Sequence, residues 1–124
     1  MVAVISCSHF PDDERIYHKE ISALHEENYV INYFTLSDSK TNLSKRGINH
    51  KNYNLSKVSL NEFLKFVERD LVKEPPKVIH IHEPELSSIA VKMKNLFNSK
   101  IIYDVHEDYI AMSNTFSRLY WPLR

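Results

Sequence analysis

The chain has 124 residues, which is enough for one folded domain but not for two of ordinary size. Hydrophobic residues make up 43% of it and charged residues 26%, a composition that excludes a disordered chain. The 16 basic residues balance the 16 acidic ones, which argues against a broad basic surface for nucleic acid, and the single cysteine excludes an internal disulfide.

The first half of the chain alternates strand and helix patterns. Val2–Cys7 is a continuous apolar run, typical of a central parallel strand that is buried on both faces. Pro11 and the three acids that follow it predict a helix start, and apolar residues then recur at helical spacing. Tyr29–Leu36 predicts a second strand, and residues 47–55 predict a short, weak third strand.

The second half continues the alternation with an amphipathic helix, a strand, a second helix, a further strand, and finally a loop with a short helix. These segments cover Ser59–Lys73, 77–82, 84–97, 100–105 and the residues from 106 onward. The alternation predicts a Rossmann-like, doubly wound α/β domain whose five-stranded, mostly parallel sheet has the order 3-2-1-4-5 and carries helices on both faces.

Two absences in the sequence narrow the function. Gly47 is the only glycine, so neither a dinucleotide fingerprint nor a Walker phosphate loop is present. The N-terminal stretch has no basic flank of the kind that signal peptides carry, and no apolar run approaches the ~20 residues that span a bilayer. We therefore expect a cytoplasmic location, with peripheral association at the inner face of the membrane left open.

Polar residues follow three strands that are adjacent in the predicted order. His9 follows the first strand, His82 and Glu83 follow the fourth, and His106 and Glu107 follow the fifth. Ligands bind such sheets at the carboxyl ends of the strands, near the switch point between the first and fourth strands. Because three histidines converge on one rim, we predict a binding site there rather than three separate structural histidines.

A metal site is the alternative interpretation of the fourth strand. His80 and His82 lie on one face of it, a spacing that occurs in barrel-type, metal-dependent hydrolases, and Asp104 and His106 alternate in the same way. Such a barrel needs roughly 200 or more residues. We therefore interpret His80 as a mid-strand residue with a buried hydrogen-bond partner, and keep a hydrolase fragment that uses both histidines as the alternative.

The first loop, "SHFPDDERIYHKE", combines acids with basic residues. Asp12 or Asp13 can cap the helix, and Arg15 and Lys19 lie four apart on one face of an α-helix. Capping alone does not explain why Arg15, His18 and Lys19 crowd the first two turns. Positive charge at that end opposes the helix dipole unless an anion binds there, and a solvated helix face is the alternative for His18 and Lys19.

Three stretches of the chain carry a resemblance to a known family. "SHFPDDERIYHKEISALHEENYVI", "KVIHIHEPEL" and "KIIYDVHEDY" resemble, in this order, the N-terminal domain of family 4-type glycosyltransferases, retaining enzymes of the two-domain GT-B architecture. The corresponding motifs are H-x-P-x-D-x-R-I-x-x-K-E, a strand that runs into H-x-H, and a strand that runs into D-x-H-E. The likeness extends from about residue 3 to the end of the chain.

The resemblance implies transfer of a sugar from a nucleotide-sugar donor to a glycan or lipid-linked acceptor, in the assembly of polysaccharide, capsule or glycoconjugate. His106 would lie near the transferred sugar as the catalytic residue. The residues expected to line the acceptor side are His9, Asp12, Arg15, His82, Glu83 and Glu107. The resemblance implies no metal and no resident cofactor, because the nucleotide sugar is a co-substrate.

In such enzymes a second domain holds most of the donor. Its E-x7-E signature is not found in this chain, so we expect residues 1–124 to form an incomplete N-terminal domain that is inactive alone. An excised piece, a truncated gene product and one chain of a split enzyme all fit this expectation. A non-catalytic interaction domain with an apolar patch around Tyr120 and Trp121, and a receiver-like domain, are the remaining alternatives.

Overall fold

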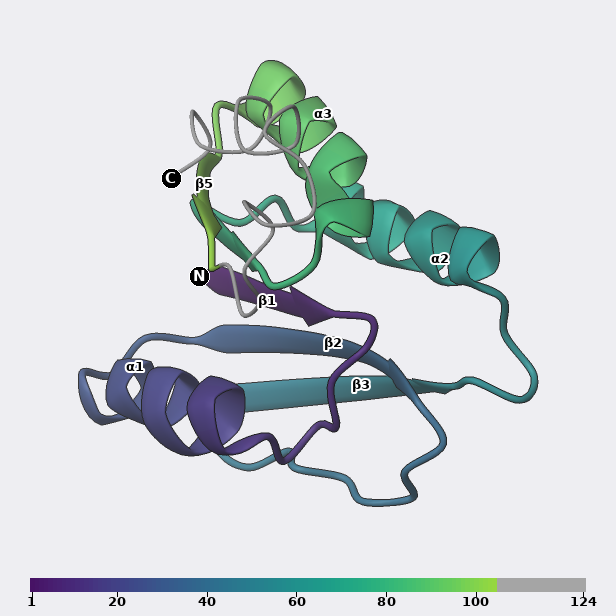
Figure 1. Cartoon of the computed structure of the whole chain (residues 1–124). Helices are drawn as coiled ribbons and strands as arrows, with labels where there is room; N and C mark the ends of the chain where they lie inside the picture. Colours follow the sequence, from purple (N-terminus) through teal and green to yellow (C-terminus); the bar gives the residue numbers. More distant parts are fainter. Residues whose placement is uncertain (105–124) are drawn as a thin grey trace, which may run out of the picture.

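The computed structural model describes residues 1–104, and its elements follow the predicted order. All five strands are parallel and run β3-β2-β1-β4-β5, which confirms the predicted topology (Figure 1). The elements are β1 (Val2–Ser6), η1 (Glu14–Ile21), α1 (Ser22–Glu26), β2 (Ile31–Ser37), β3 (Ile48–Asn54), α2 (Leu60–Lys73), β4 (Val78–Ile81), η2 (Pro84–Leu86), α3 (Ser87–Phe97) and β5 (Lys100–Tyr103). The helix predicted beyond residue 106 lies outside the described residues.

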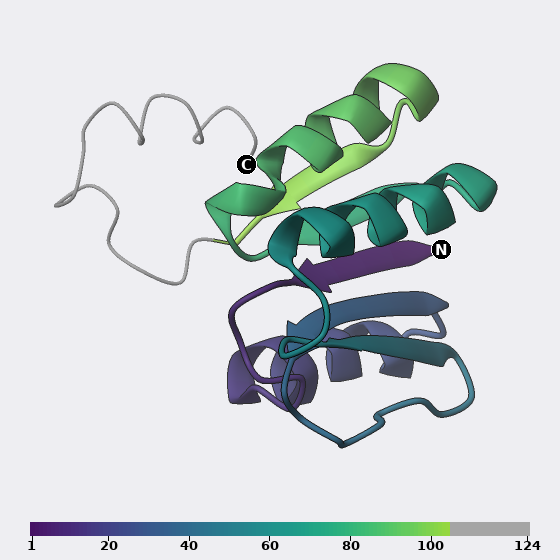
Figure 2. The same cartoon turned by 90° about the vertical axis from the view of Figure 1, so that its right-hand side faces the viewer.

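Successive residues of β1 face two separate cores, because side chains alternate along a strand. Val4 packs with Ile16 of η1, whereas Ile5 packs with Phe63 of α2 and Met93 of α3. η1 and α1 accordingly cover one face of the sheet, and α2 and α3 cover the other (Figures 1 and 2). Every residue of β1 is buried, as its uninterrupted apolar run predicts.

The first helix differs from the predicted α-helix. Asp13 is its N-cap, and the carboxylate accepts hydrogen bonds from the backbone N–H groups of Arg15 and Ile16, each at 3.0 Å. The eight residues of η1 form a π-helix, which continues into the short α-helix α1. A π-helix closes i to i+5 hydrogen bonds, so a residue five positions on lies nearer to the same face than it would in an α-helix.

The other helices begin where their sequences predict. Ser59 caps α2 in a capping box with Glu62, in which each side chain binds the other residue's backbone N–H. Pro84 starts a single 3₁₀ turn, η2, and α3 continues from it and ends at Asn98 in the left-handed conformation. The carboxyl end of β4 therefore leads directly into a helix start.

The third strand lies within the predicted residues 47–55. β3 has seven residues and pairs with β2 along its whole length. Polar side chains on the two strands bind one another: Thr35 lies 2.8 Å from Nε2 of His50 and donates to Asn52. Because this pairing is polar, the hydrophobic pattern that reveals most strands is weak here.

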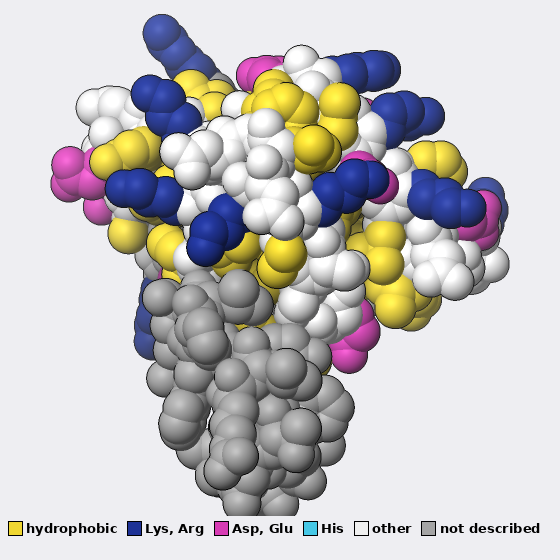
Figure 3. Space-filling view, turned by 90° about the horizontal axis from the view of Figure 1, so that it is seen from above, with side chains coloured by type: hydrophobic (Ala, Val, Ile, Leu, Met, Phe, Trp, Pro, Cys, Tyr) yellow, Lys and Arg dark blue, Asp and Glu magenta, His cyan; other side chains and the backbone are white. Residues whose placement is uncertain are grey.

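The face seen from above Figure 1, where α3 lies, carries scattered lysine and arginine side chains, with apolar and acidic side chains between them (Figure 3). They do not gather into one patch on this face, in keeping with the balanced charge of the sequence. None of the helices within residues 1–104 is long and apolar enough to cross a membrane.

Candidate functional site

Glu83 organises the carboxyl ends of β1 and β4. Its carboxylate is 3% exposed and accepts hydrogen bonds from the backbone N–H of Cys7 at 2.7 Å and from the hydroxyl of Ser6 at 2.9 Å. The same carboxylate binds Nδ1 of His9. Because a carboxylate accepts hydrogen bonds, Nδ1 of His9 is the donor, and Glu83 fixes the orientation of the ring.

Arg15 connects η1 to the end of β5. Its guanidinium lies 2.5 Å from Oδ1 of Asp104 and 3.6 Å from Oε1 of Glu20. The wider π-helical turn brings Glu20, five residues on, closer to the face of Arg15 than α-helical spacing would place it.

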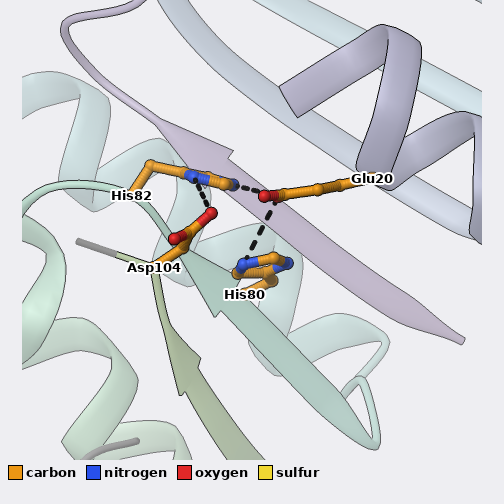
Figure 4. A group of neighbouring side chains, drawn as sticks. All are labelled: Glu20, His80, His82 and Asp104. Carbon is orange, nitrogen blue, oxygen red and sulfur yellow. Dashed lines mark ion pairs between the residues drawn. The ribbon is translucent and has the colours of Figure 1, made fainter. Parts of the chain in front are cut away.

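A second polar cluster lies behind this ion pair and contains Glu20, His80, His82 and Asp104 (Figure 4). Each residue offers one ligand-type atom, and these atoms all lie within 4.8 Å of one another. Oε2 of Glu20 lies 3.5 Å from Nε2 of His80 and 3.7 Å from Nε2 of His82. The two imidazole rings stack with their centroids 4.5 Å apart.

Burial changes the chemistry of Glu20. Removal from water, a hydrogen bond with Asp104 and the charge of Asp104 raise the pKa of the Glu20 carboxyl from 4.5 to about 8, and the charge of Arg15 partly opposes the rise. Glu20 thus belongs to a tightly packed group in which two carboxyls share one guanidinium.

A pocket of about 190 Å³ opens beside His9 at the carboxyl ends of β1 and β2. Phe10 and Leu55 form apolar parts of its wall and expose 66% and 55% of their surface, and Ser37 and Asp38 add polar groups. Exposed apolar side chains can pack against the C–H face of a sugar ring, and neighbouring polar groups can form hydrogen bonds with its hydroxyls. The remaining lining residues are Cys7, Ser8 and Leu36.

The Cys7 thiol in this pocket is not an activated nucleophile. Burial raises its pKa well above the ordinary value, and the nearby carboxylates of Glu83 and Glu85 raise it further. We therefore assign Cys7 to packing.

The predicted site residues fall into three groups. His9, Arg15, His82 and Glu83 come together at the predicted edge of the sheet. Asp12 is exposed, and the aspartate position of the H-x-P-x-D motif is Asp13, which caps the helix instead of lining the edge. His106 and Glu107 lie outside the described residues.

The four predicted residues that come together at this edge, His9, Arg15, His82 and Glu83, differ in their exposure to solvent. His82 and Glu83 are 1% and 3% exposed, so an acceptor at the surface does not reach their side chains, and Glu83 instead holds neighbouring groups in place. The half-exposed guanidinium of Arg15 and the partly exposed ring of His9 remain as the groups that a ligand can reach.

Glu20 was not among the predicted site residues. Glu20 is the last residue of the first motif, which ends in K-E, and this was the one sequence feature that could have identified it. α-Helical spacing, however, gives no reason to expect a contact between Glu20 and Arg15 or between Glu20 and β4. The π-helix supplies that reason, and it cannot be read from hydrophobic periodicity.

Comparison of the chain with protein-family models, with curated proteins and with solved structures found no match in any of the three. The functional proposal below therefore depends on the sequence motifs and on the geometry of the site.

Proposed function

We propose that this chain is the acceptor-side portion of a retaining GT-B glycosyltransferase, which moves a sugar from a nucleotide-sugar donor to a glycan or lipid-linked acceptor in the synthesis of polysaccharide or glycoconjugate. Its part is to bind and orient the acceptor. The donor is held mainly by a second domain, present on the same polypeptide or on a partner chain. Both domains are needed, because sugar transfer requires that donor and acceptor are aligned and that water is excluded from between them.

The observation that carries the proposal is the contact between the three segments that resemble the family. His9 of the first segment binds Glu83 of the second, and Arg15 of the first binds Asp104 of the third. Glu20 of the first lies beside His80 and His82 of the second. The three segments therefore form one structural unit at this edge of the sheet.

The location of that unit also fits an acceptor wall. It lies at the carboxyl ends of β1 and β4, the switch point where open α/β sheets bind ligands. His9, oriented by Glu83, offers a ring edge to an acceptor hydroxyl, and Arg15 offers a guanidinium to an acceptor phosphate. In the complete enzyme, His106 contacts the donor sugar as that sugar acquires positive character.

A metal-dependent hydrolase is the second candidate, and the cluster around His80 and His82 favours it. Against it, the sheet of the described residues is open and has two edge strands, β3 and β5, whereas such hydrolases are closed barrels of eight strands. Hydrolysis of p-nitrophenyl phosphate or p-nitrophenyl acetate that requires added zinc is the result that would support the hydrolase over the transferase.

The test of the transferase proposal is calorimetric titration of the purified chain with two sets of ligands. One set contains UDP- and GDP-linked hexoses, and the other contains short-chain lipid diphosphate sugars. We expect saturable binding of an acceptor of the second kind and weak or no binding of the nucleotide sugars. Tight binding of a nucleotide sugar, or the absence of binding by every acceptor, would contradict the proposal.

A further inference from the structure

Glu20, His80 and His82 come from distant parts of the chain and meet near the carboxyl end of β4. Glu20 lies on η1, whereas His80 belongs to β4 and His82 follows it directly, so that both imidazoles are directed to the same side as the carboxylate (Figure 4). We propose that these three side chains bind one divalent transition-metal cation of the zinc type, with Asp104 as an outer partner of His82.

The distances around Oε2 of Glu20 fit two ligands that share an ion with it. Two ligands on one tetrahedral zinc ion, each about 2.0 to 2.1 Å from it, lie about 3.3 Å apart. Oε2 lies 3.5 Å from Nε2 of His80 and 3.7 Å from Nε2 of His82, which is longer than a good hydrogen bond and close to that separation. Oε2 is buried and accepts no hydrogen bond from any described residue.

A carboxylate lies beside the second ring nitrogen of His82. Nδ1 of His82 faces Oδ2 of Asp104 at 4.0 Å, while Nε2 faces Glu20. A carboxylate on the second ring nitrogen is the usual outer partner of a metal-binding histidine. His82 has no exposed side-chain surface, so its ring cannot turn away into solvent.

Arg15 binds the same two carboxylates, Glu20 and Asp104, through the oxygens that do not face the imidazole rings. It binds Oε1 of Glu20 and Oδ1 of Asp104, the oxygens opposite those that face the rings. The guanidinium therefore holds both carboxylates from outside and does not occupy the space between the three ligand atoms.

The ligand types select the class of ion. Two imidazole nitrogens and one carboxylate oxygen match zinc, cobalt and ferrous iron, whereas magnesium and calcium prefer sets made entirely of oxygen. Three protein ligands also leave a coordination position open. A bound ion would tie η1 to β4 and, through Glu20, would stiffen the support of Arg15.

This inference is independent of the proposed transferase function. The glycosyltransferase resemblance implies no metal, and the acceptor contacts assigned to His9 do not involve the three ligands. A chain can therefore bind acceptor without zinc, or zinc without acceptor, and each result bears on one proposal alone.

The experiment is equilibrium dialysis of the metal-stripped chain against zinc chloride, with metal content measured by mass spectrometry, and against cobalt chloride, with visible absorption as the readout. We expect one equivalent of zinc or cobalt per chain and none of magnesium at the same concentration. Glu20→Gln and His80→Asn should each weaken zinc binding at least tenfold, while Asp104→Asn should weaken it about ten- to a hundredfold without abolishing it.

His18→Gln is the matched control, because His18 is an exposed imidazole on the same helix as Glu20. It should bind zinc as the wild type does. Circular dichroism and melting temperature establish that each variant is folded, and zinc should raise the melting temperature of the wild type but not that of Glu20→Gln. Less than one equivalent in the wild type, or unchanged affinity in both Glu20→Gln and His80→Asn, would overturn the proposal.

Discussion

Arg15 and Glu20 are five residues apart in the sequence, and their side chains meet 3.6 Å apart on one side of η1. The π-helical register makes this contact and directs both residues toward the end of β5, where Arg15 also binds Asp104. Since π-helical turns recur at functional sites, this register is itself a reason to place a ligand site at the start of the first helix.

Replacing Glu83 by Gln should destabilise the fold. An amide has one accepting oxygen, and its NH₂ group would face Ser6 and the ring of His9, both of which now donate to the carboxylate. We expect the free energy of unfolding to fall by about 1 to 3 kcal/mol, measured by urea denaturation.

Glu85→Gln is the control for this change, because Glu85 is exposed and lies two residues from Glu83. Its effect should stay within about 0.5 kcal/mol. Equal destabilisation by the two variants would show that Glu83 does not organise the site.

His9→Ala and Arg15→Ala should reduce sugar transfer by the complete enzyme much more than they reduce its stability. Both side chains reach solvent, so an ion pair such as that of Arg15 contributes at most about 1 kcal/mol to folding. The measurements are kcat/KM with respect to the acceptor, and melting temperature. We expect a loss of tenfold or more in kcat/KM.

Lys19→Ala serves as the comparison for these two variants, because Lys19 is exposed on the same helix. It should leave both quantities near the wild-type values. If activity and melting temperature fall in parallel in His9→Ala and Arg15→Ala, capping and packing are a sufficient explanation of the first loop.

His50 should make the stability of the fold sensitive to mild acid. Burial lowers the pKa of His50 below its ordinary value of 6.5. The ring is neutral in the folded protein, since Nδ1 accepts a hydrogen bond from the backbone N–H of Leu43 at 3.0 Å. The unfolded chain binds a proton at a higher pH than the folded chain, so stability is fully present above about pH 6.5 and decreases below it.

The free energy of unfolding, measured at pH 7.5, 6.5 and 5.5, checks this expectation. The contribution of His50 to the decrease is at most about 1.4 kcal/mol per pH unit. His50→Gln keeps one acceptor and one donor but cannot titrate, so its decrease with acid should be smaller than that of the wild type. An identical pH profile in the two proteins would assign the acid sensitivity to other groups.

Ser59→Ala should remove the capping box of α2 without touching the site. The hydroxyl of Ser59 accepts from the backbone N–H of Glu62 at 3.1 Å, and Glu62 binds back to the N–H of Ser59 at 3.1 Å. We expect a loss of about 1 kcal/mol in the free energy of unfolding, with acceptor binding unchanged. Ser56→Ala, in the preceding turn, is the neighbouring control.

The topology of the sheet was predictable because local patterns determine it. Residues 2–5 of β1 are an unbroken apolar run, which indicates burial on both faces, and the alternation with helices then predicts parallel strands and crossovers. The sheet order and the clustering of polar residues after β1 and β4 follow from the same rules.

The details of the site were less predictable, because they depend on contacts between residues far apart in the chain. Nothing in the sequence near Glu83 indicates that its carboxylate will accept hydrogen bonds from Ser6, Cys7 and His9, which are 74 to 77 residues away. The role of Glu20 required the π-helical register. β3 gave only a weak sequence signal because polar side chains form part of its pairing with β2.

The most direct test of the acceptor-wall proposal is a nuclear magnetic resonance titration of the ¹⁵N-labelled chain with a short-chain lipid diphosphate sugar. The account predicts saturable shifts concentrated in residues 7–15 and 82–85, with little change on addition of a nucleotide sugar. Saturable shifts caused by the nucleotide sugar would contradict this proposal. Acceptor-induced shifts confined to the amino ends of the strands, around Val30 and Lys77, would also contradict it.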